Sequence, residues 1–163
     1  MASQHGTAAL LYQARAVRDF GDGFVAVLLP VYLVEIGLGA FEVGVVATLA
    51  LLGSALTTLG VGLLSARYDQ RALLIAASGL MVATGVAFAV SNTYALVLLV
   101  AFCGTVNPSS GSVSVFVPLE HAALARSAVD AQRTRMFARY GLIGALAAAV
   151  GSLAAASPDV LTT

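Results

Sequence analysis

The chain has 163 residues, of which 60% are hydrophobic and only 10% charged, and its mean hydropathy is +0.95. About a quarter of the residues of soluble globular domains are charged, so this composition predicts an integral membrane protein instead. Eight basic and eight acidic residues give a formal net charge of zero, and the lone cysteine excludes disulfide frameworks, CxxC redox motifs and zinc sites within the chain.

The first apolar segment covers residues 17–38 and carries a carboxylate close to its expected cytoplasmic edge. That group, Asp22, is costly in lipid unless it faces protein, water or a partner. Arg18 precedes Asp22 by four residues, so the two side chains could pair on a helix; alternatively, Asp22 and Tyr32 line a solute cavity. Pro30 lies near mid-span and predicts a bend.

The second segment, residues 43–64, is rich in small residues. Such residues let neighbouring helix backbones approach closely, which is the usual way that helices associate in lipid. We expect these positions to pack against other helices first and to contact a ligand second: Gly44, Ala47, Ala50, Gly53, Ser54, Thr57, Thr58, Gly60 and Gly62.

A short polar break, residues 65–71, separates the second segment from a long uncharged run. That run is too long for one crossing of a hydrocarbon core about 30 Å thick. The polar residues 91–93 divide it into segments 73–90 and 94–117, which we expect to form a helical hairpin.

The segment 94–117 is unusual because Pro108 interrupts its hydrogen-bond ladder. A span interrupted by glycine and proline points to a transport cavity, and its lining is then expected to include Asn107, Ser109 and Ser110. The alternative is a helix that is kinked but internally satisfied by these same polar groups.

One sizeable polar stretch, residues 119–139, follows Pro118, which we expect to end the fourth span. Residues 120–126 predict a short amphipathic helix at the membrane interface. The fifth span is then expected over residues 140–156, where three glycines again offer a close-packing face: Gly141, Gly144 and Gly151.

Arginine supplies all eight basic residues, in groups at 15–18, 67–71 and 126–139. Five spans place all three groups on one side of the membrane and Glu35, Glu42 and Asp159 on the other. The positive-inside rule then predicts a cytoplasmic amino terminus and an external carboxyl terminus. We expect an all-α, polytopic protein with five transmembrane helices in a single domain, residues 1–163, located in a plasma (inner) membrane.

Four features make the chain similar to the amino-terminal half of a major facilitator superfamily transporter. They are Leu29-Pro-Val-Tyr-Leu33 with Gly37-Leu-Gly39, the glycine-rich second span, the break at 62–71 and the long basic loop after the fourth span. The resemblance covers nearly the whole chain and implies most of a six-helix half-bundle. It also implies a secondary transporter, or a piece of one, that moves a small solute by alternating access.

The loop between the second and third spans matches the family's signature in part. Gly62, Arg67 and Arg71 stand where the family has a glycine, a basic residue and the end of a basic pair, but Ala66 replaces an acidic residue and Asp69 a second glycine. The resemblance implies that this loop latches onto the other half of the carrier in the outward-facing state. The alternative is a role in topology and in contact with phosphate headgroups.

Two signatures of the proton-coupled antiporters are missing. The position in the fourth span that would carry an arginine is Ala101, and residues 141–151 contain no proline. The family's minimal architecture is two six-span bundles, so the chain looks truncated. Its expected partners are the lipid bilayer, a small solute and the missing carboxyl-terminal half, and we expect it not to transport alone.

Two other function classes remain. The chain could be a small structural or assembly subunit whose glycine-rich faces bind other membrane helices. A membrane-embedded enzyme is disfavoured because such enzymes need clustered carboxylates, and only Asp19 and Asp22 lie close together within one segment. We therefore expect no catalytic residue, metal or cofactor, and no binding to nucleic acid.

Overall fold

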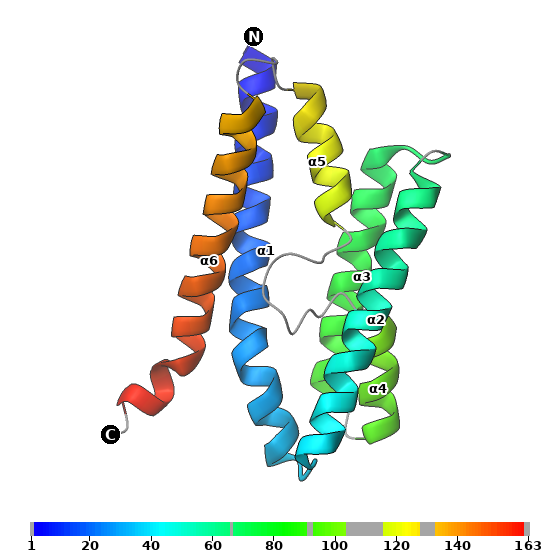
Figure 1. The fold of residues 1–163 in the computed structure, drawn as a ribbon, viewed down its shortest axis with the longest axis vertical. Coiled ribbons are helices and arrows are strands. Elements are labelled where there is room, and N and C mark those ends of the chain that lie inside the picture. The colour runs from blue at the N-terminus through cyan, green and yellow to red at the C-terminus, as the bar shows by residue number, and fades with distance from the viewer. Residues whose placement is uncertain (1, 66, 91–92, 104–115, 128–132, 162–163) are drawn as a thin grey trace.

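The computed structural model describes residues 2–65, 67–90, 93–103, 116–127 and 133–161, and nearly all of them are helical (Figure 1). The helices are α1 (Ala2–Glu35), α2 (Ala40–Leu64), α3 (Gln70–Val90), α4 (Tyr94–Cys103), α5 (Phe116–Ser127) and α6 (Arg133–Leu161). No strand occurs within these described ranges. The predicted all-α fold class is therefore confirmed.

Within the described part of the chain, three helices are long and apolar enough to cross a membrane: Ala40–Leu64, Arg71–Val90 and Arg133–Ser157. They correspond to the second, third and fifth predicted spans. Charged residues between positions 15 and 22 interrupt the apolar sequence of α1, and the helix described in the fourth segment, α4, has ten residues. The predicted count of five spans is not confirmed and stays a prediction.

The helices extend beyond the apolar runs from which they were predicted. α1 begins at Ala2 rather than near residue 17, and α6 runs from Arg133 to Leu161 rather than over 140–156. The prediction that Pro118 ends a helix is wrong, because Pro118 lies in the first turn of α5. Its missing N–H costs no intrahelical hydrogen bond there.

The helices fall into two groups joined by α5 (Figure 1). α1 lies beside α6 along most of its length, α2 packs against α4, and α5 contacts helices of both groups. The beginning of α1, the turn between α2 and α3, the end of α5 and the beginning of α6 lie at one end of the molecule. The end of α1 and the beginning of α4 lie at the other (Figure 1).

Glycines mark where helix backbones approach most closely. A Cβ atom on Gly53 of α2 would overlap the carbonyl of Phe102 in α4, and one on Gly23 of α1 would overlap the carbonyl of Ala148 in α6. Gly151 makes a third such contact, with α1. The expected close packing does not extend to several other glycines, where nothing described lies within 4 Å of a Cβ: Gly44, Gly60, Gly62 and Gly141.

An apolar contact joins α1, α2 and α4 at the end of α1 that is remote from the amino terminus. The ring of Tyr32 lies 6.1 Å from that of Phe88 beside it. We call this contact the apolar cluster, and its buried members are Leu29, Leu33, Val46, Ala50, Val97 and Ala101. Its side chains hold three helices together by van der Waals packing alone, as is usual in lipid.

Candidate functional site

The opposite half of α1 carries charged side chains that are buried rather than exposed. Arg15, Arg18 and Asp19 are 6%, 8% and 1% exposed, respectively. The Nε atom of Arg15 lies 2.6 Å from Oδ2 of Asp19 one turn later, and the Nε atom of Arg18 lies 3.8 Å from Oδ1 of the same carboxylate. Asp19 is therefore placed between two guanidinium groups.

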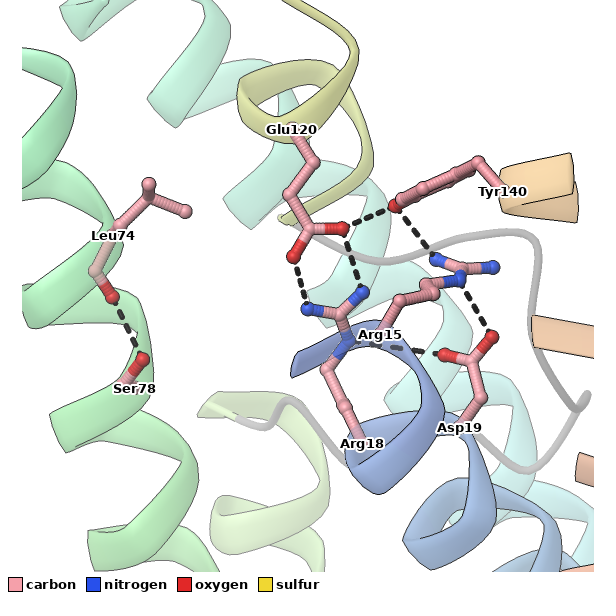
Figure 2. Close-up of polar contacts among 7 residues, drawn as sticks. All are labelled: Arg15, Arg18, Asp19, Leu74, Ser78, Glu120 and Tyr140. Carbon is pink, nitrogen blue, oxygen red and sulfur yellow. Dashed lines mark hydrogen bonds and ion pairs between the residues drawn. The ribbon is translucent and has the colours of Figure 1, made fainter. Parts of the chain in front are cut away.

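Glu120 of α5 completes the pairing of Arg18 from a distant part of the chain (Figure 2). Both terminal nitrogens of Arg18 donate to the carboxylate, Nη1 to Oε1 at 2.6 Å and Nη2 to Oε2 at 2.9 Å. Such a two-pronged contact fits the planar fork of arginine and is among the strongest hydrogen-bond arrangements in proteins. Glu120 is 2% exposed, so the pair is shielded from solvent.

Tyr140 of α6 joins this pair to the other one. Its hydroxyl donates to Oε2 of Glu120 and accepts a hydrogen bond of 3.3 Å from Nη1 of Arg15. The Arg15 guanidinium also lies 4.8 Å from the centre of the Tyr140 ring, within the range of a cation–π contact. The tyrosine therefore links α1, α5 and α6 in one network.

Aromatic rings surround the charged groups. The guanidinium of Arg18 lies 4.4 Å from the centre of the Phe116 ring, and Phe116 in turn packs against Ala77 of α3. His121 of α5 meets the rings of Phe137 and Tyr140 edge-on, at 5.1 and 5.3 Å between centroids. We call Arg15, Arg18, Asp19, Glu120 and Tyr140 the ion cluster.

A shallow cavity of about 470 Å³ opens beside the ion cluster. Arg15, Asp19, His121 and Tyr140 form its polar wall, and Gly144 lies opposite the charged groups. A Cβ on Gly144 would collide with the Asp19 carboxylate and with Arg15. The absence of a side chain at this position therefore leaves room for the ion pair between α1 and α6.

Comparison with known proteins identifies the family. The family model of the Major Facilitator Superfamily matches residues 12–157, nearly the whole chain. The chain belongs to the major facilitator superfamily. An uncharacterised membrane protein of Saccharomyces cerevisiae, YJR124C, is 24% identical over 144 residues, which cover 88% of this chain and 32% of the yeast protein. The chain thus spans about a third of the length of that relative. No solved structure matches.

This major facilitator chain is therefore a transporter-like membrane protein, and the members of its family are transporters rather than enzymes. Its signature loop lies at the turn between α2 and α3. Arg67, Asp69 and Arg71 are all exposed, and neither arginine forms an ion pair with another described residue. The Asp69 carbonyl accepts the N–H of Leu73 at 3.1 Å, which starts α3. Gly62 is also exposed.

Of the residues predicted to line a cavity, the two that the structure describes, Asp22 and Tyr32, do not line a common pocket. Tyr32 lies in the wall of an apolar pocket of about 360 Å³ between α1 and α3, together with Phe24, Leu28 and Phe88. Asp22 is buried on α1 and is not among the residues that line that pocket. Asn107, Ser109 and Ser110 lie outside the described residues. Their predicted role in a solute cavity stays a prediction.

The expected pairing of Arg18 with Asp22 is replaced by the pairing with Glu120. Spacing along one helix predicted the first pair, but the second joins residues 102 positions apart, for which no local pattern exists. One signal was present. Glu120 is flanked at helical spacing by Phe116 and Leu124, so a charged residue sits on the apolar face of its helix, where it needs a partner.

Proposed function

We propose that this chain forms most of one half-bundle of a secondary transporter and, together with a second bundle, moves a small solute by alternating access. The family match over residues 12–157 carries the proposal. The buried ion cluster supports it, because charged side chains inside a membrane bundle are costly and mark solute or ion pathways. The chain covers 32% of its yeast relative, which is consistent with the need for further helices.

We propose five membrane crossings, with α4 and α5 belonging to the fourth. The arrangement in Figure 1 supports this, because α4 begins at one end of the molecule and α5 ends at the other. The exposed arginines at the α2–α3 turn and at the beginning of α6 then share one side, which the positive-inside rule makes cytoplasmic. The membrane is proposed to be the plasma membrane.

Cysteine labelling tests this orientation. In a Cys103→Ala background, Tyr68→Cys and Phe41→Cys introduce thiols at aromatic positions that are 60% and 83% exposed, on opposite ends of the molecule. A reagent that cannot cross lipid is expected to label position 41 but not position 68 in intact cells, and both after permeabilisation. Labelling of position 68 in intact cells contradicts the proposed orientation.

Arg67 and Arg71 are proposed to form the cytoplasmic latch between the two bundles. Their support is that both are exposed and unpaired within the described chain, so they are free to bind acidic groups or helix carbonyls of the second bundle. The variant Arg67→Gln with Arg71→Gln is expected to weaken co-purification of the two bundles, whereas Arg135→Gln, an exposed arginine of α6, leaves it unchanged.

An uptake assay tests the transport proposal. Cells expressing this chain together with a second six-helix bundle are screened against labelled solutes of several chemical classes, with Glu120→Gln as a matched variant. Saturable uptake is expected only when both bundles are present and is lost in Glu120→Gln. Saturable uptake by this chain alone contradicts the need for a second bundle, and the absence of any uptake by the pair contradicts the transporter proposal.

A second candidate function is a structural or assembly subunit. The observation that favours it is the open face of α2, where Gly44, Gly60 and Gly62 have no described atom within 4 Å of a Cβ position. A partner helix could pack closely there. The discriminating result is a stable complex with other membrane proteins that Gly60→Leu disrupts, with no transport by any combination of bundles.

A further inference from the structure

The buried charges of the described chain do not balance. Two guanidinium groups, Arg15 and Arg18, share the interior with three carboxylates, Asp19, Asp22 and Glu120. The remaining arginines with described side chains are exposed. When every group is ionised, the interior carries one uncompensated negative charge. An isolated charge is too costly to persist in such surroundings, so one carboxylate needs a neutralising ligand.

The contacts identify which carboxylate lacks compensation. Arg15 is paired with Asp19 at 2.6 Å, and both terminal nitrogens of Arg18 are engaged by Glu120. Asp22 is 7% exposed and makes no hydrogen bond or ion pair with any described residue. It follows Arg18 by four residues and Asp19 by three, so it lies on the same face of α1 as the ion cluster.

Among the side chains that the structure describes, no other group near the ion cluster supplies the missing positive charge. From α5, the titratable groups are Glu120, which is already paired, and His121, whose ring contacts are with Phe137 and Tyr140 rather than with a carboxylate. From α6, the hydroxyl of Tyr140 is used by Glu120 and Arg15. On α1 itself, both arginines are committed to other carboxylates.

The geometry favours a proton over a metal cation as the neutralising ligand. Hard cations are held by several oxygen ligands at once. Among the residues described, no group of three or more His, Cys, Asp or Glu side chains could hold a metal ion. A single carboxylate can instead be neutralised by one proton.

We propose that Asp22 is a proton-binding site. Its carboxylate takes one proton from a hydronium ion of the adjoining water, so that one O–H bond of hydronium breaks as an O–H bond to Asp22 forms, and the buried charges then sum to zero. Release of that proton restores the uncompensated charge and weakens the packing of α1 against its neighbours. Coupling of this proton to solute movement rests on the proposed function, whereas binding of the proton does not.

Infrared difference spectroscopy tests the proposal on the whole chain in lipid nanodiscs. The carbonyl stretch of a protonated carboxylic acid is followed as neutral buffer is exchanged for alkaline buffer. The wild type is expected to show this band at neutral pH and to lose it on alkalinisation. Asp22→Asn is expected to lack the band, and Asp69→Asn, which removes an exposed acid outside the ion cluster, to retain it.

Two further variants, Asp22→Glu and His121→Gln, complete the infrared experiment. If Asp22→Asn fails to fold, as judged by circular dichroism, Asp22→Glu replaces it and is expected to retain the band at a shifted frequency. His121→Gln is expected to leave the band in place. Persistence of the band in Asp22→Asn, its absence from the wild type, or its loss when choline is replaced by sodium at constant pH would each overturn the proposal. Because no transport is measured, failure of the proposed transport function leaves this result intact.

Discussion

The two halves of α1 are attached to the rest of the molecule by opposite chemistries. Towards its amino terminus, the ion cluster joins α1 to α5 and α6 through directional contacts between buried charges. Towards its other end, the apolar cluster joins α1 to α2 and α4 through side chains without polar atoms. The first contact requires particular partners, whereas the second requires only volume and shape.

That difference matters for a transporter. A network of paired charges has discrete arrangements, because a guanidinium either faces its carboxylate or leaves it, and each state can be biased by a ligand or a proton. An apolar contact contains no charged group on which a proton or an ionic ligand could act. If the proposed alternating access holds, the contact of α1 expected to change is the one in its charged half.

The largest expected effect comes from removing one charge of the ion cluster. Glu120→Gln keeps the size of the side chain but leaves Arg18 buried without its carboxylate. We expect the free energy of unfolding to fall by about 3–5 kcal/mol, the cost of breaking a buried ion pair from one side. Reversible unfolding in mixed detergent micelles measures it.

The matched control is Glu35→Gln, which changes an exposed glutamate at the end of the same α1 helix. Its effect is expected to stay within about 0.5 kcal/mol, as for most surface substitutions. Equal effects of the two variants would show that Arg18 does not depend on Glu120.

The next largest effect is expected for Tyr140→Phe, which removes the hydroxyl that donates to Glu120 and accepts from Arg15. The loss of a hydrogen bond to a charged group predicts a decrease of about 1.5–3 kcal/mol in unfolding free energy. Tyr68→Phe, at an exposed position, is the control and is expected to be neutral. If Tyr140→Phe left the free energy of unfolding unchanged, the Tyr140 hydroxyl would not contribute to the ion cluster.

The apolar half is sensitive to close approach rather than to charge. Gly53→Ala places a methyl group against the carbonyl of Phe102, so α2 and α4 must move apart at a cost of about 1–3 kcal/mol. Gly60→Ala, on the same helix but with open space around the Cβ position, is expected to be neutral or stabilising by up to about 1 kcal/mol. The same unfolding assay measures both variants. Equal changes in the free energy of unfolding for Gly53→Ala and Gly60→Ala would contradict the close contact between α2 and α4 at Gly53.

The smallest effect is expected for Leu33→Met in the apolar cluster. Leu33 is 1% exposed, but a swap that conserves volume costs less than about 1.5 kcal/mol. Since Glu120→Gln also conserves shape, the ratio of the two losses measures directly how different the two attachments are. A larger loss for Leu33→Met than for Glu120→Gln would reverse the comparison.

The apolar half was also the half that the sequence predicted better. The runs of Val, Leu and Ala in 43–64 and 73–90 place α2 and α3 nearly where they are found, because hydropathy and helix formation depend on neighbours along the chain. The close approach at Gly53 follows from the same small-residue pattern. Even so, similar glycines at positions 44 and 60 remain open, since a local pattern does not say which face meets another helix.

The charged half was predicted poorly because its contacts are not local. Arg18 has one acidic residue at helical spacing, Asp22 four residues later. It is nevertheless paired with Glu120, from a helix that was expected to lie at the membrane surface. For Tyr140, the sequence predicts only the start of an apolar span. These groups meet only when α1, α5 and α6 are assembled. The one indication of this in the sequence is that Glu120 lies between apolar residues at helical spacing, where it needs a partner.

The length of α1 gives this arrangement a geometric consequence. With 34 residues, the helix is about 51 Å long at about 1.5 Å per residue, well beyond the hydrocarbon thickness of about 30 Å. One continuous helix therefore connects the ion cluster, where α1 meets α5 and α6, with the apolar cluster, where it meets α2 and α4. Arg18 and Leu33 are 15 residues apart, so these two attachments are separated by about 22 Å along the helix axis.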